Sequence, residues 1–448
     1  MQFLTPTTMN LPSAFVKRIQ EQFADNADDF INALTNEPKT SIRYNRAKTS
    51  KAENNSIPWA KDAYFLETRP SFTLDPLFHA GHYYVQEASS MLIEQVFNQY
   101  LKTDSAMRIL DICAAPGGKS THIMSLINDQ SYLVSNEIIS NRSNILMENI
   151  IKWGTGNALV TNSDPSKFTY LKNHFDAILV DAPCSGEGLF RKNPDACAEW
   201  SEKNCTICVH RQRDIFRTMW ECLKEGGIMI YSTCTYNPEE NERNLAALQE
   251  EFNFDVLPLS LKEEWQIQEV KFNSILGYQF LPHKSNGEGF YLSIIQKPGI
   301  LTQKEGKIKN RNHPFKSFLN ESSADKFDAK HVHNRDYFMP NNMSDDFDAY
   351  KSLHIKHAGV CIGEEINKKL IPDHSLALFA GLNVNSFPRL DLEEKSALNY
   401  LAKRDFVIDG PLGWNVVTFE NAPLGFIKNM GNRFNNYYPN EWKIRMNF

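Results

Sequence analysis

Two cysteines follow predicted strands and could act together on one substrate. Cys184 lies in the segment Asp181-Ala-Pro-Cys, and Cys234 lies in the segment Ser232-Thr-Cys-Thr. Each comes directly after an apolar run that indicates a buried strand. One thiolate could add to an electron-poor ring, and the second thiol could help to undo that adduct. The pair therefore indicates covalent catalysis at the end of two neighbouring strands.

The reaction that suits two thiols and one carboxyl group is methylation of a pyrimidine carbon. Cytosine C5 is a poor nucleophile until a group adds at C6, and a carboxyl group held at ring N3, such as that of Asp181, stabilises the charge that develops. The alternative is that each cysteine packs as a small hydrophobe, the usual role of an isolated buried cysteine. Polar, Pro-rich or Gly-rich sequence beside Cys184 and Cys234 favours catalysis, but the residues themselves do not decide which thiol attacks.

A small, Gly-rich segment joins the predicted strand 107–112 to a predicted helix at 120–127. Its residues are Cys113, Ala114, Ala115, Pro116, Gly117, Gly118 and Lys119. A triphosphate-binding loop would need glycine where Cys113 stands, and the dinucleotide pattern Gly-x-Gly-x-x-Gly is absent. A turn of this kind still lets a ligand approach the backbone closely, which favours a nucleoside without phosphates.

Acidic residues follow three further predicted strands. Glu137 could accept the ribose hydroxyls, Asp164 could bind the adenine edge, and Asp181 completes an acidic rim. Such a rim would repel phosphates and attract the sulfonium cation of S-adenosylmethionine. Each acid alone could instead be a helix cap or a turn residue. Their joint position at successive strand ends predicts an S-adenosylmethionine site.

The elements that must position these residues alternate between strands and helices. The pattern predicts strands at 107–112, 132–136, 158–161, 177–180 and 228–232, with helices at 89–100, 120–127, 142–153 and 198–224. Gly226-Gly227 is expected to end the last helix. This order predicts an α/β fold with a mostly parallel, doubly wound sheet covered on both faces.

The flanking regions carry local basic charge. A helical pattern at 11–35 precedes the segment 39–61, which holds Lys39, Arg43, Arg46, Lys48, Lys51 and Lys61 against Glu53 alone. The segment 301–320 holds Lys304, Lys307, Lys309, Arg311 and Lys316 against Glu305. Near the C-terminus, Lys428, Arg433, Lys443 and Arg445 are interleaved with Phe434, Tyr437, Tyr438 and Trp442. Basic and aromatic residues in alternation suit single-stranded RNA, although solvated loops and an ordinary small β-rich domain remain alternatives.

Composition sets the broad class. The chain has 448 residues, 42% hydrophobic and 23% charged, with a net charge of −6 and a pI of about 6.1, so RNA binding would have to use local patches. No secretory signal or membrane-spanning run is present, and eight cysteines do not make a disulfide scaffold, so we expect a cytoplasmic protein with free thiols and no membrane contact. We expect no metal, because Cys197, Cys205, Cys208 and His210 lack the second well-spaced pair of a zinc site. We also expect a monomer.

Three segments resemble the signature motifs of the Nop/Sun family of RNA cytosine-C5 methyltransferases: 111–120, 181–192 and 231–242. The stretch from Arg69-Pro-Ser-Phe to Val85-Gln-Glu-Ala-Ser-Ser90 resembles its bacterial RsmF-type branch. The resemblance implies that Cys234 is the nucleophile, that Cys184 assists product release, and that Cys113–Lys119, Glu137, Asp164 and Asp181 contact S-adenosylmethionine. In DNA cytosine methyltransferases the cysteine of the Pro-Cys pair attacks, which is the reverse assignment. The two roles therefore rest on the family resemblance.

The resemblance also implies a division into regions. These are an N-terminal α+β RNA-binding segment (1–83), a Rossmann-like class I methyltransferase domain (84–297), a polar basic linker or extension (298–354) and a C-terminal β-rich PUA-like RNA-binding domain (355–448). The expected substrate is ribosomal RNA of the small subunit, most simply 16S rRNA. A transfer RNA methyltransferase and a non-catalytic RNA-binding assembly factor are the alternatives.

Overall fold

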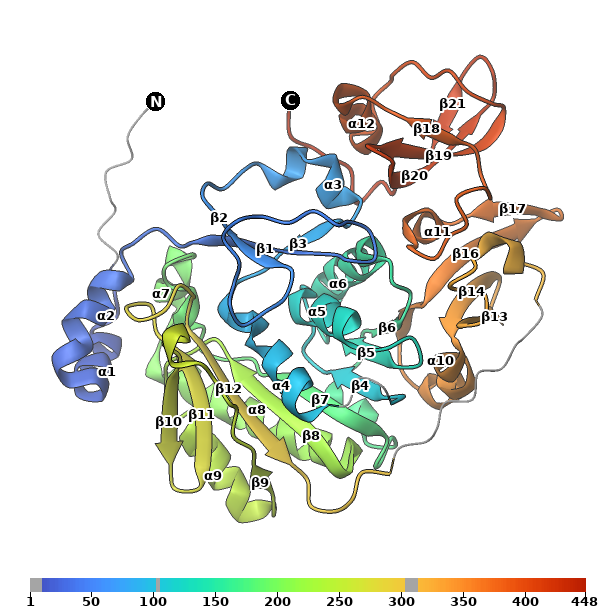
Figure 1. Cartoon of the computed structure of the whole chain (residues 1–448). Coiled ribbons are helices and arrows are strands. Elements are labelled where there is room, and N and C mark those ends of the chain that lie inside the picture. The colour runs from blue at the N-terminus through green and yellow to red at the C-terminus, as the bar shows by residue number, and fades with distance from the viewer. Residues whose placement is uncertain (1–9, 102–104, 303–312) are drawn as a thin grey trace.

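A sheet of ten strands forms the centre of the molecule in the computed structural model, which describes residues 10–101, 105–302 and 313–448 (Figure 1). The strand order is β10-β11-β12-β8-β7-β4-β5-β6-β15, with β9 paired to β12. The strands β4 to β8 run parallel, while β10, β11, β12 and β15 add antiparallel edges. The predicted α/β class with a doubly wound parallel centre is therefore confirmed.

Five strands of this sheet, β4 to β8, overlap the five predicted strands, and the other five were not predicted. They are β4 (Arg108–Asp111), β5 (Tyr132–Asn136), β6 (Ala158–Thr161), β7 (Phe175–Asp181), β8 (Leu223–Thr233), β9 (Asp255–Val256), β10 (Gln268–Phe272), β11 (Ile275–Phe280), β12 (Phe290–Gln296) and β15 (Ile355–Ala358). The chain winds from β4 to β5 and β6 in one direction, then crosses to β7 and β8 on the other side of β4. The C-terminal ends of β4 and β7 therefore form a switch point, where ligands of such sheets bind.

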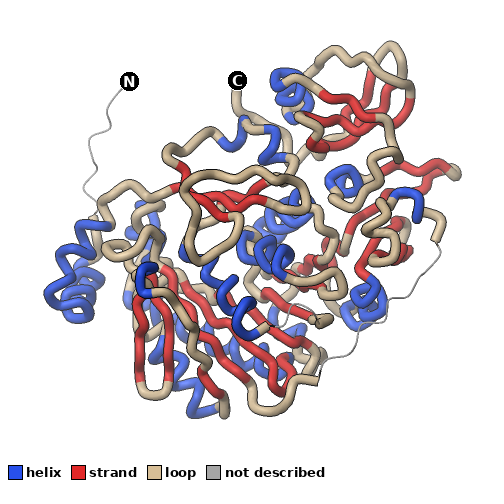
Figure 2. Tube along the Cα trace, viewed as in Figure 1, coloured by secondary structure: helices blue, strands red, loops and turns tan. Residues whose placement is uncertain are grey.

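Helices cover both faces of the sheet because alternate strand residues point to opposite sides (Figure 2). Ile109 packs into a core with the helices α4 (Ile93–Tyr100), α5 (Gly118–Leu126) and α6 (Ser140–Trp153). Its neighbour Leu110 packs into a second core with α8 (Glu202–Cys222) and α9 (Glu242–Glu251). These two cores hold the strand ends in place.

Two helix predictions were wrong in detail. The helix expected over 198–224 is split into α7 (Pro194–Glu199) and α8, because Ser201 caps the second helix through the Asn204 amide, at 3.2 Å. Gly226-Gly227 does not end that helix, which stops at Cys222, and lies within β8 instead. Gly226 has φ +70°, and a Cβ there would stand 2.3 Å from the Leu301 nitrogen.

An N-terminal part packs beside the ends of the central strands. It contains α1 (Ser13–Phe23), α2 (Ala27–Ala33), α3 (Pro76–His79) and a three-stranded antiparallel sheet of β1 (Thr40–Tyr44), β2 (Ala63–Leu66) and β3 (Tyr83–Val85). The boundary expected after residue 83 falls inside β3. Residues 1–9, which bear on the predicted lack of a secretory signal, lie outside the described residues.

The stretch 298–354, expected as a linker or extension, contains helices and strands. Its residues 313–354 are folded into β13 (Phe327–Val332), β14 (Arg335–Pro340) and α10 (Asn341–Asp346). Met339, Met343 and Tyr350 are buried against the central sheet, and the Asp346 carboxylate binds Arg108 at 2.6 Å. Few apolar residues, spread over short strands, hid this region from the sequence pattern. Lys304, Lys307, Lys309 and Arg311 of the basic stretch lie outside the described residues.

The C-terminal region continues this arrangement. The strands β16 (Val360–Ile366) and β17 (Lys369–Pro372) join β13 and β14 in one four-stranded sheet, so the boundary expected at 355 divides that sheet. A second four-stranded sheet contains β18 (Arg389–Asp391), β19 (Gly413–Phe419), β20 (Ala422–Asn429) and β21 (Phe434–Asn436), packed with α11 (His374–Leu378) and α12 (Glu394–Leu401). Among the described residues, no helix has the length and apolar content needed to cross a membrane.

The remaining helical segments are single 3₁₀ turns that connect these elements: η1 (Ala24–Asn26), η2 (Phe72–Leu74), η3 (Ser89–Leu92), η4 (Pro165–Phe168), η5 (Glu187–Leu189), η6 (Glu263–Trp265), η7 (Lys316–Phe318) and η8 (Phe347–Tyr350).

Candidate active site

Two cavities open at the C-terminal ends of the central strands. One, the Glu137 cavity, has a volume of about 820 Å³ and is lined by Glu137, Asp164, Cys184, Arg142 and the side chains of Ile112, Ile138, Ile139 and Ile215. The other, the Arg69 cavity, has a volume of about 930 Å³ and is lined by Arg69, Lys39, Lys119, Arg191, Lys192, Tyr84 and Phe290. Cys113, Ala115, Asp181, Leu189 and Cys234 line both cavities.

The two predicted thiols meet where these cavities join. Cys184 and Cys234 lie in loops after the neighbouring strands β7 and β8, and their Sγ atoms are 3.2 Å apart. The Cys234 amide also donates to the Cys184 sulfur at 3.3 Å. The hydrogen bond with Cys234 and burial raise the pKa of Cys184 well above its ordinary value. Cys184 therefore holds its proton, and among these two thiols only Cys234 faces both cavities.

Asp181 stands at the end of β7 beside both thiols. Its Oδ2 accepts a hydrogen bond from Lys119 Nζ at 2.8 Å, and its Oδ1 accepts one from Ser232 Oγ at 2.8 Å. Burial alone would lower the pKa of Lys119, but Asp181 outweighs that effect and the pKa is raised. Lys119 therefore keeps its positive charge beside Asp181 in the wall between the cavities.

The other predicted acids occupy the far end of the Glu137 cavity. Glu137 follows β5, accepts the Ile139 amide at 2.9 Å and lies 3.4 Å from the Arg142 guanidinium. Asp164 follows β6 and caps the short turn η4 by accepting the Ser166 amide at 2.9 Å, and this hydrogen bonding lowers its pKa. Asp164 is thus both a turn residue, the simpler alternative, and part of the cavity lining.

The loop 113–119 is divided between the two cavities. Only Cys113 and Ala115 line the Glu137 cavity, while Ala114, Pro116, Gly118 and Lys119 line the Arg69 cavity. Gly117 lines neither: its φ is +114°, and a Cβ there would stand 3.2 Å from Leu146 of α6. The sequence assigned the whole loop to one ligand, because spacing does not tell which side of a turn each residue faces.

The basic segment 39–61 is used differently from the uniform RNA contact that its charge suggested. Arg43 is buried at 2% exposure and donates to Gln86 and Thr121, and Lys48 donates to two backbone carbonyls. Arg46 pairs with Asp62 at 2.5 Å. Lys39 is exposed and lines the Arg69 cavity. Three of the six cations therefore hold the N-terminal part together, and one remains available at the site.

Sequence reasoning missed several charged residues of the site. Arg191 and Lys192 follow the Cys184 segment and pair with the buried Glu288, at 2.9 and 3.7 Å. Glu240 is fully buried and accepts the Ser185 amide at 2.8 Å. These charged residues lie inside the segments 181–192 and 231–242, which contain the two cysteines. A buried charged residue within such a segment indicates a functional position.

Among the described residues, one group of three potential metal ligands lies close together, formed by Glu187, Cys205 and Glu240, with ligand atoms within 4.8 Å of one another. Cys197, Cys208 and His210 are not part of it. Burial and the two nearby carboxylates raise the pKa of Cys205 to about 12, so its sulfur stays a thiol. A structural zinc site takes four ligands, and this group supplies three.

Three regions of the chain match models of known protein families. Residues 98–296 match "16S rRNA methyltransferase RsmB/F", residues 11–88 match "N-terminal domain of 16S rRNA methyltransferase RsmF", and residues 387–444 match "Methyltransferase RsmF PUA domain". Each of the three regions contains elements of a separate sheet of the structure.

Relatives and solved structures agree with these models. A protein of Escherichia fergusonii named ribosomal RNA small subunit methyltransferase F is 30% identical, over 97% of each chain, and one of Shewanella loihica is 28% identical over 97% of this chain and 95% of its own. A methyltransferase homolog from Pyrococcus horikoshii is similar in structure, with a TM-score of 0.55 and 25% identity, over 66% of this chain and all of that one.

The predicted Rossmann-like methyltransferase domain and the predicted family are thus confirmed, together with the β-rich PUA domain at the C-terminal end. The chain belongs to the RsmB/F family of 16S rRNA methyltransferases, in its RsmF branch, and is a methyltransferase that uses S-adenosylmethionine.

Proposed function

We propose that this protein methylates C5 of a cytosine in RNA, most simply in 16S rRNA, through a covalent adduct between Cys234 and C6 of the base. The single observation that carries the proposal is the contact of Cys234 and Cys184, at 3.2 Å, in the wall shared by two cavities, one lined by an excess of carboxylates and the other by an excess of lysine and arginine. The names of the family and of its RsmF relatives support ribosomal RNA as the substrate.

The Arg69 cavity suits an extruded base. Tyr84 and Phe290 offer aromatic surfaces, and Arg69, Lys39 and Lys192 supply positive charge for the flanking phosphates. A target base must leave its stack to reach a thiol at the bottom of such a cavity. The Cys234 thiolate would then add to C6, and the carboxyl group of Asp181, carrying a proton, would give it to ring N3 and so neutralise the developing charge.

The donor set of the Glu137 cavity fits S-adenosylmethionine. Carboxylates of Glu137, Asp164 and Asp181 face isoleucine side chains and Pro165 across a space of about 820 Å³, which suits a nucleoside that carries a cation. Bound there, the cofactor supplies an electrophilic methyl group. Glu137 would hold the ribose, Asp164 the adenine edge, and Cys113 and Ala115 the body of the ligand.

After methyl transfer, a solvent water takes the C5 proton, the electron pair of that C–H bond forms the C5=C6 double bond, the C6–sulfur bond breaks, and ring N3 returns its proton to the Asp181 carboxylate. We assign Cys184 to this release step. Its raised pKa keeps it in the thiol form, so it is a poor nucleophile but can give a proton to the departing Cys234 sulfur. Its position 3.2 Å from that sulfur supports this role.

The flanking regions are proposed to hold the RNA. Residues 11–88 form one side of the Arg69 cavity, and 387–444 carry the PUA region with basic and aromatic residues, so we propose RNA contacts for both. We also retain as predictions that 298–354 is an extension of the catalytic domain, that the protein acts as a monomer, and that it works in a reducing cytoplasm, which suits two free thiols.

Transfer RNA methylation and a non-catalytic role in assembly are the competing functions. Bisulfite sequencing of total RNA from cells with and without the gene separates all three. A protected cytosine that disappears from 16S rRNA in the deletion strain is the expected result. Loss of a site in transfer RNA would instead support the first alternative, and no change in either RNA would support the second.

The thiol roles have their own test, with Cys234→Ala and Cys184→Ala incubated with labelled RNA and cofactor. Cys234→Ala is expected to lose methylation by at least about 10³-fold and to form no adduct, because the nucleophile is gone. Cys184→Ala is expected to accumulate a denaturation-resistant protein–RNA adduct on gels. An adduct with Cys234→Ala and none with Cys184→Ala would reverse the roles.

A further inference from the structure

The buried carboxylate of Glu240 holds the loop that carries Cys184. Glu240 Oε2 accepts the Ser185 amide at 2.8 Å, and Oε1 accepts the Ser185 hydroxyl at 2.5 Å. Ser185 directly follows Cys184 in the chain, so these two hydrogen bonds fix the peptide on one side of the thiol. The role of Glu240 goes beyond the motif resemblance, which gave this residue no function.

The other side of Cys184 is fixed through Gln212 of α8. Gln212 Nε2 donates to the Pro183 carbonyl at 3.0 Å and to Glu240 Oε2 at 3.3 Å. The amide oxygen of Gln212 in turn accepts hydrogen bonds from Tyr231 and Asn244, at 3.1 and 2.9 Å. Glu240 and Gln212 thus hold the residues immediately before and after Cys184.

Glu240 also joins this loop to the loop of Cys234. Thr235, which follows Cys234, has its hydroxyl 3.0 Å from that of Ser185 and 3.4 Å from Glu240 Oε1. The Glu240 carbonyl accepts the Tyr231 hydroxyl at 2.7 Å, which ties Glu240 to β8. One side chain therefore sets the distance between two loops that come from different strands.

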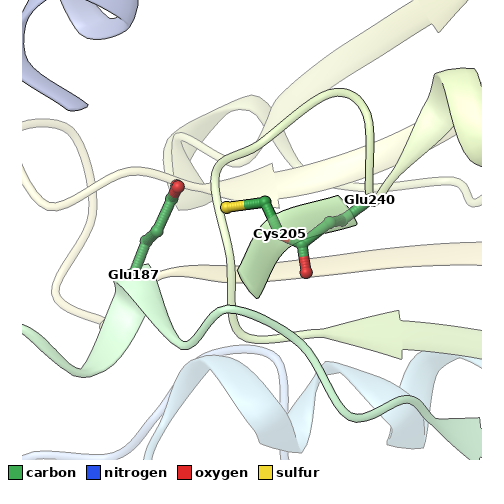
Figure 3. Close-up of side chains that lie close together, drawn as sticks. All are labelled: Glu187, Cys205 and Glu240. Carbon is green, nitrogen blue, oxygen red and sulfur yellow. The ribbon is translucent and has the colours of Figure 1, made fainter. Parts of the chain in front are cut away.

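The cluster of Glu187, Cys205 and Glu240 in Figure 3 lies where these loops contact each other, and its carboxylates bind groups of the chain rather than an ion. Glu187 is already bound by Arg18 at 2.6 Å, by the Trp200 indole at 3.0 Å and by the Tyr236 amide at 3.2 Å. With the four donors to Glu240 and a protonated Cys205, both carboxylates have their partners within the chain.

We propose that Glu240 is a positioning residue that keeps Cys184 beside Cys234 for release of the methylated base. The inference rests on the proposed function. A carboxylate is needed because both of its oxygens accept, each from two donors, and an amide would turn an NH₂ group toward the Ser185 donors. The charge of Glu240 also contributes to the raised pKa of Cys184, which favours the thiol needed for release.

Glu240→Gln tests this role, with Glu239→Gln as the matched control, because Glu239 is exposed and its ion pair in the described part of the chain is with Arg243. Hydrogen bonds to a charged group are worth about 10- to 100-fold, so turnover of Glu240→Gln should fall by that factor. The first methylation of each enzyme molecule should fall about threefold or less, and a protein–RNA adduct should accumulate. Glu239→Gln should match the wild type.

Two further variants make every outcome decisive. Ser185→Ala removes the hydroxyl that donates to Glu240 and contacts Thr235 but keeps the Ser185 amide, and should show the same adduct at a lower level if Glu240→Gln does not fold. Equal losses in the first turnover and in steady state, without adduct, would make Glu240 merely structural and overturn the inference. If Cys184→Ala itself yields no adduct, the release step of the proposed function fails, and the inference fails with it.

Discussion

The Glu137 cavity and the Arg69 cavity share a wall but differ in charge. Carboxylates outnumber cations around the Glu137 cavity, with Glu137, Asp164, Asp181 and Asp214 against Arg142 and Arg211. Around the Arg69 cavity the cations are in slight excess, with Lys39, Arg69, Lys119, Arg191 and Lys192 against Glu87, Asp111, Asp181 and Glu288. A sulfonium ligand is stabilised in the acidic space and RNA phosphates in the basic one. Asp181 and Cys234 face both spaces. The comparison shows how one sheet edge keeps two oppositely charged ligands apart except at the atoms that react.

Loss of the acid in the Glu137 cavity should have the largest effect on this separation. Glu137→Gln keeps the shape of the side chain and removes its charge, so we expect affinity for S-adenosylmethionine to fall about 10- to 100-fold. Affinity for RNA should not change. Isothermal titration with the cofactor, and filter binding with RNA, measure the two separately. Equal losses in both would show that the cavities do not separate the ligands.

Loss of charge from the Arg69 cavity should have a smaller effect, confined to RNA. Arg69→Ala and Lys192→Ala are each expected to weaken RNA binding several-fold and to lower the salt dependence of binding by about one phosphate contact. Cofactor affinity should stay constant. Lys271→Ala, on the exposed edge strand β10, is the matched control. An unchanged salt slope in both cavity variants would place the RNA elsewhere.

A separate effect, on folding stability rather than on ligand binding, concerns Asp111, which is buried at the end of β4; one of its oxygens has no hydrogen-bond partner among the described residues, and the other is bound by Ser120 at 2.7 Å. Burial raises the pKa of Asp111 from 3.8 to about 7. Folding therefore favours the protonated form, and its stabilisation is complete below pH 4 and lost as the pH rises through 7.

The side chain of Asp111→Asn cannot ionise, so the variant should not lose this stabilisation as the pH rises. Between pH 5 and pH 8, the free energy of unfolding of the wild type should fall by roughly 2–3 kcal/mol more than that of the variant. Urea unfolding without ligands at both pH values measures the difference. Asp255→Asn, at an exposed position, should follow the wild type. Parallel pH profiles for wild type and Asp111→Asn would exclude Asp111 as the ionising group.

Much of the central fold could be predicted, because strands buried on both faces leave long apolar runs and parallel strands require helices between them. The segment at 158–161 was placed at the observed bounds of β6. The stretch 313–354 was missed, because its contribution to the core comes from isolated residues such as Met339, Met343 and Tyr350. Long-range partners, Arg108 with Asp346 among them, cannot be read from local spacing.

In the candidate site, too, local sequence pattern identified the residue types but not their long-range partners. Cys184, Cys234, Asp181, Glu137 and Asp164 were identified from strand ends, and the structure brings all of them to the two cavities. Arg43 and Lys48 belong to a segment whose charge suggests RNA binding, yet Arg43 is buried, Lys48 is half-buried, and both bind groups of the chain itself. Charge along the sequence does not reveal whether a partner inside the fold already neutralises or binds it.

The sequence by itself determined which chemistry the protein carries: two thiols and a carboxyl group after buried strands, and an acidic rim in place of a phosphate loop. Only the tertiary structure decided that Cys234 faces both cavities, that Cys184 stays protonated beside it, and that Glu240 holds their loops together. The reason is physical. Residue types and strand order follow from local pattern, whereas hydrogen-bond partners, burial and pKa depend on side chains that are far apart in the chain.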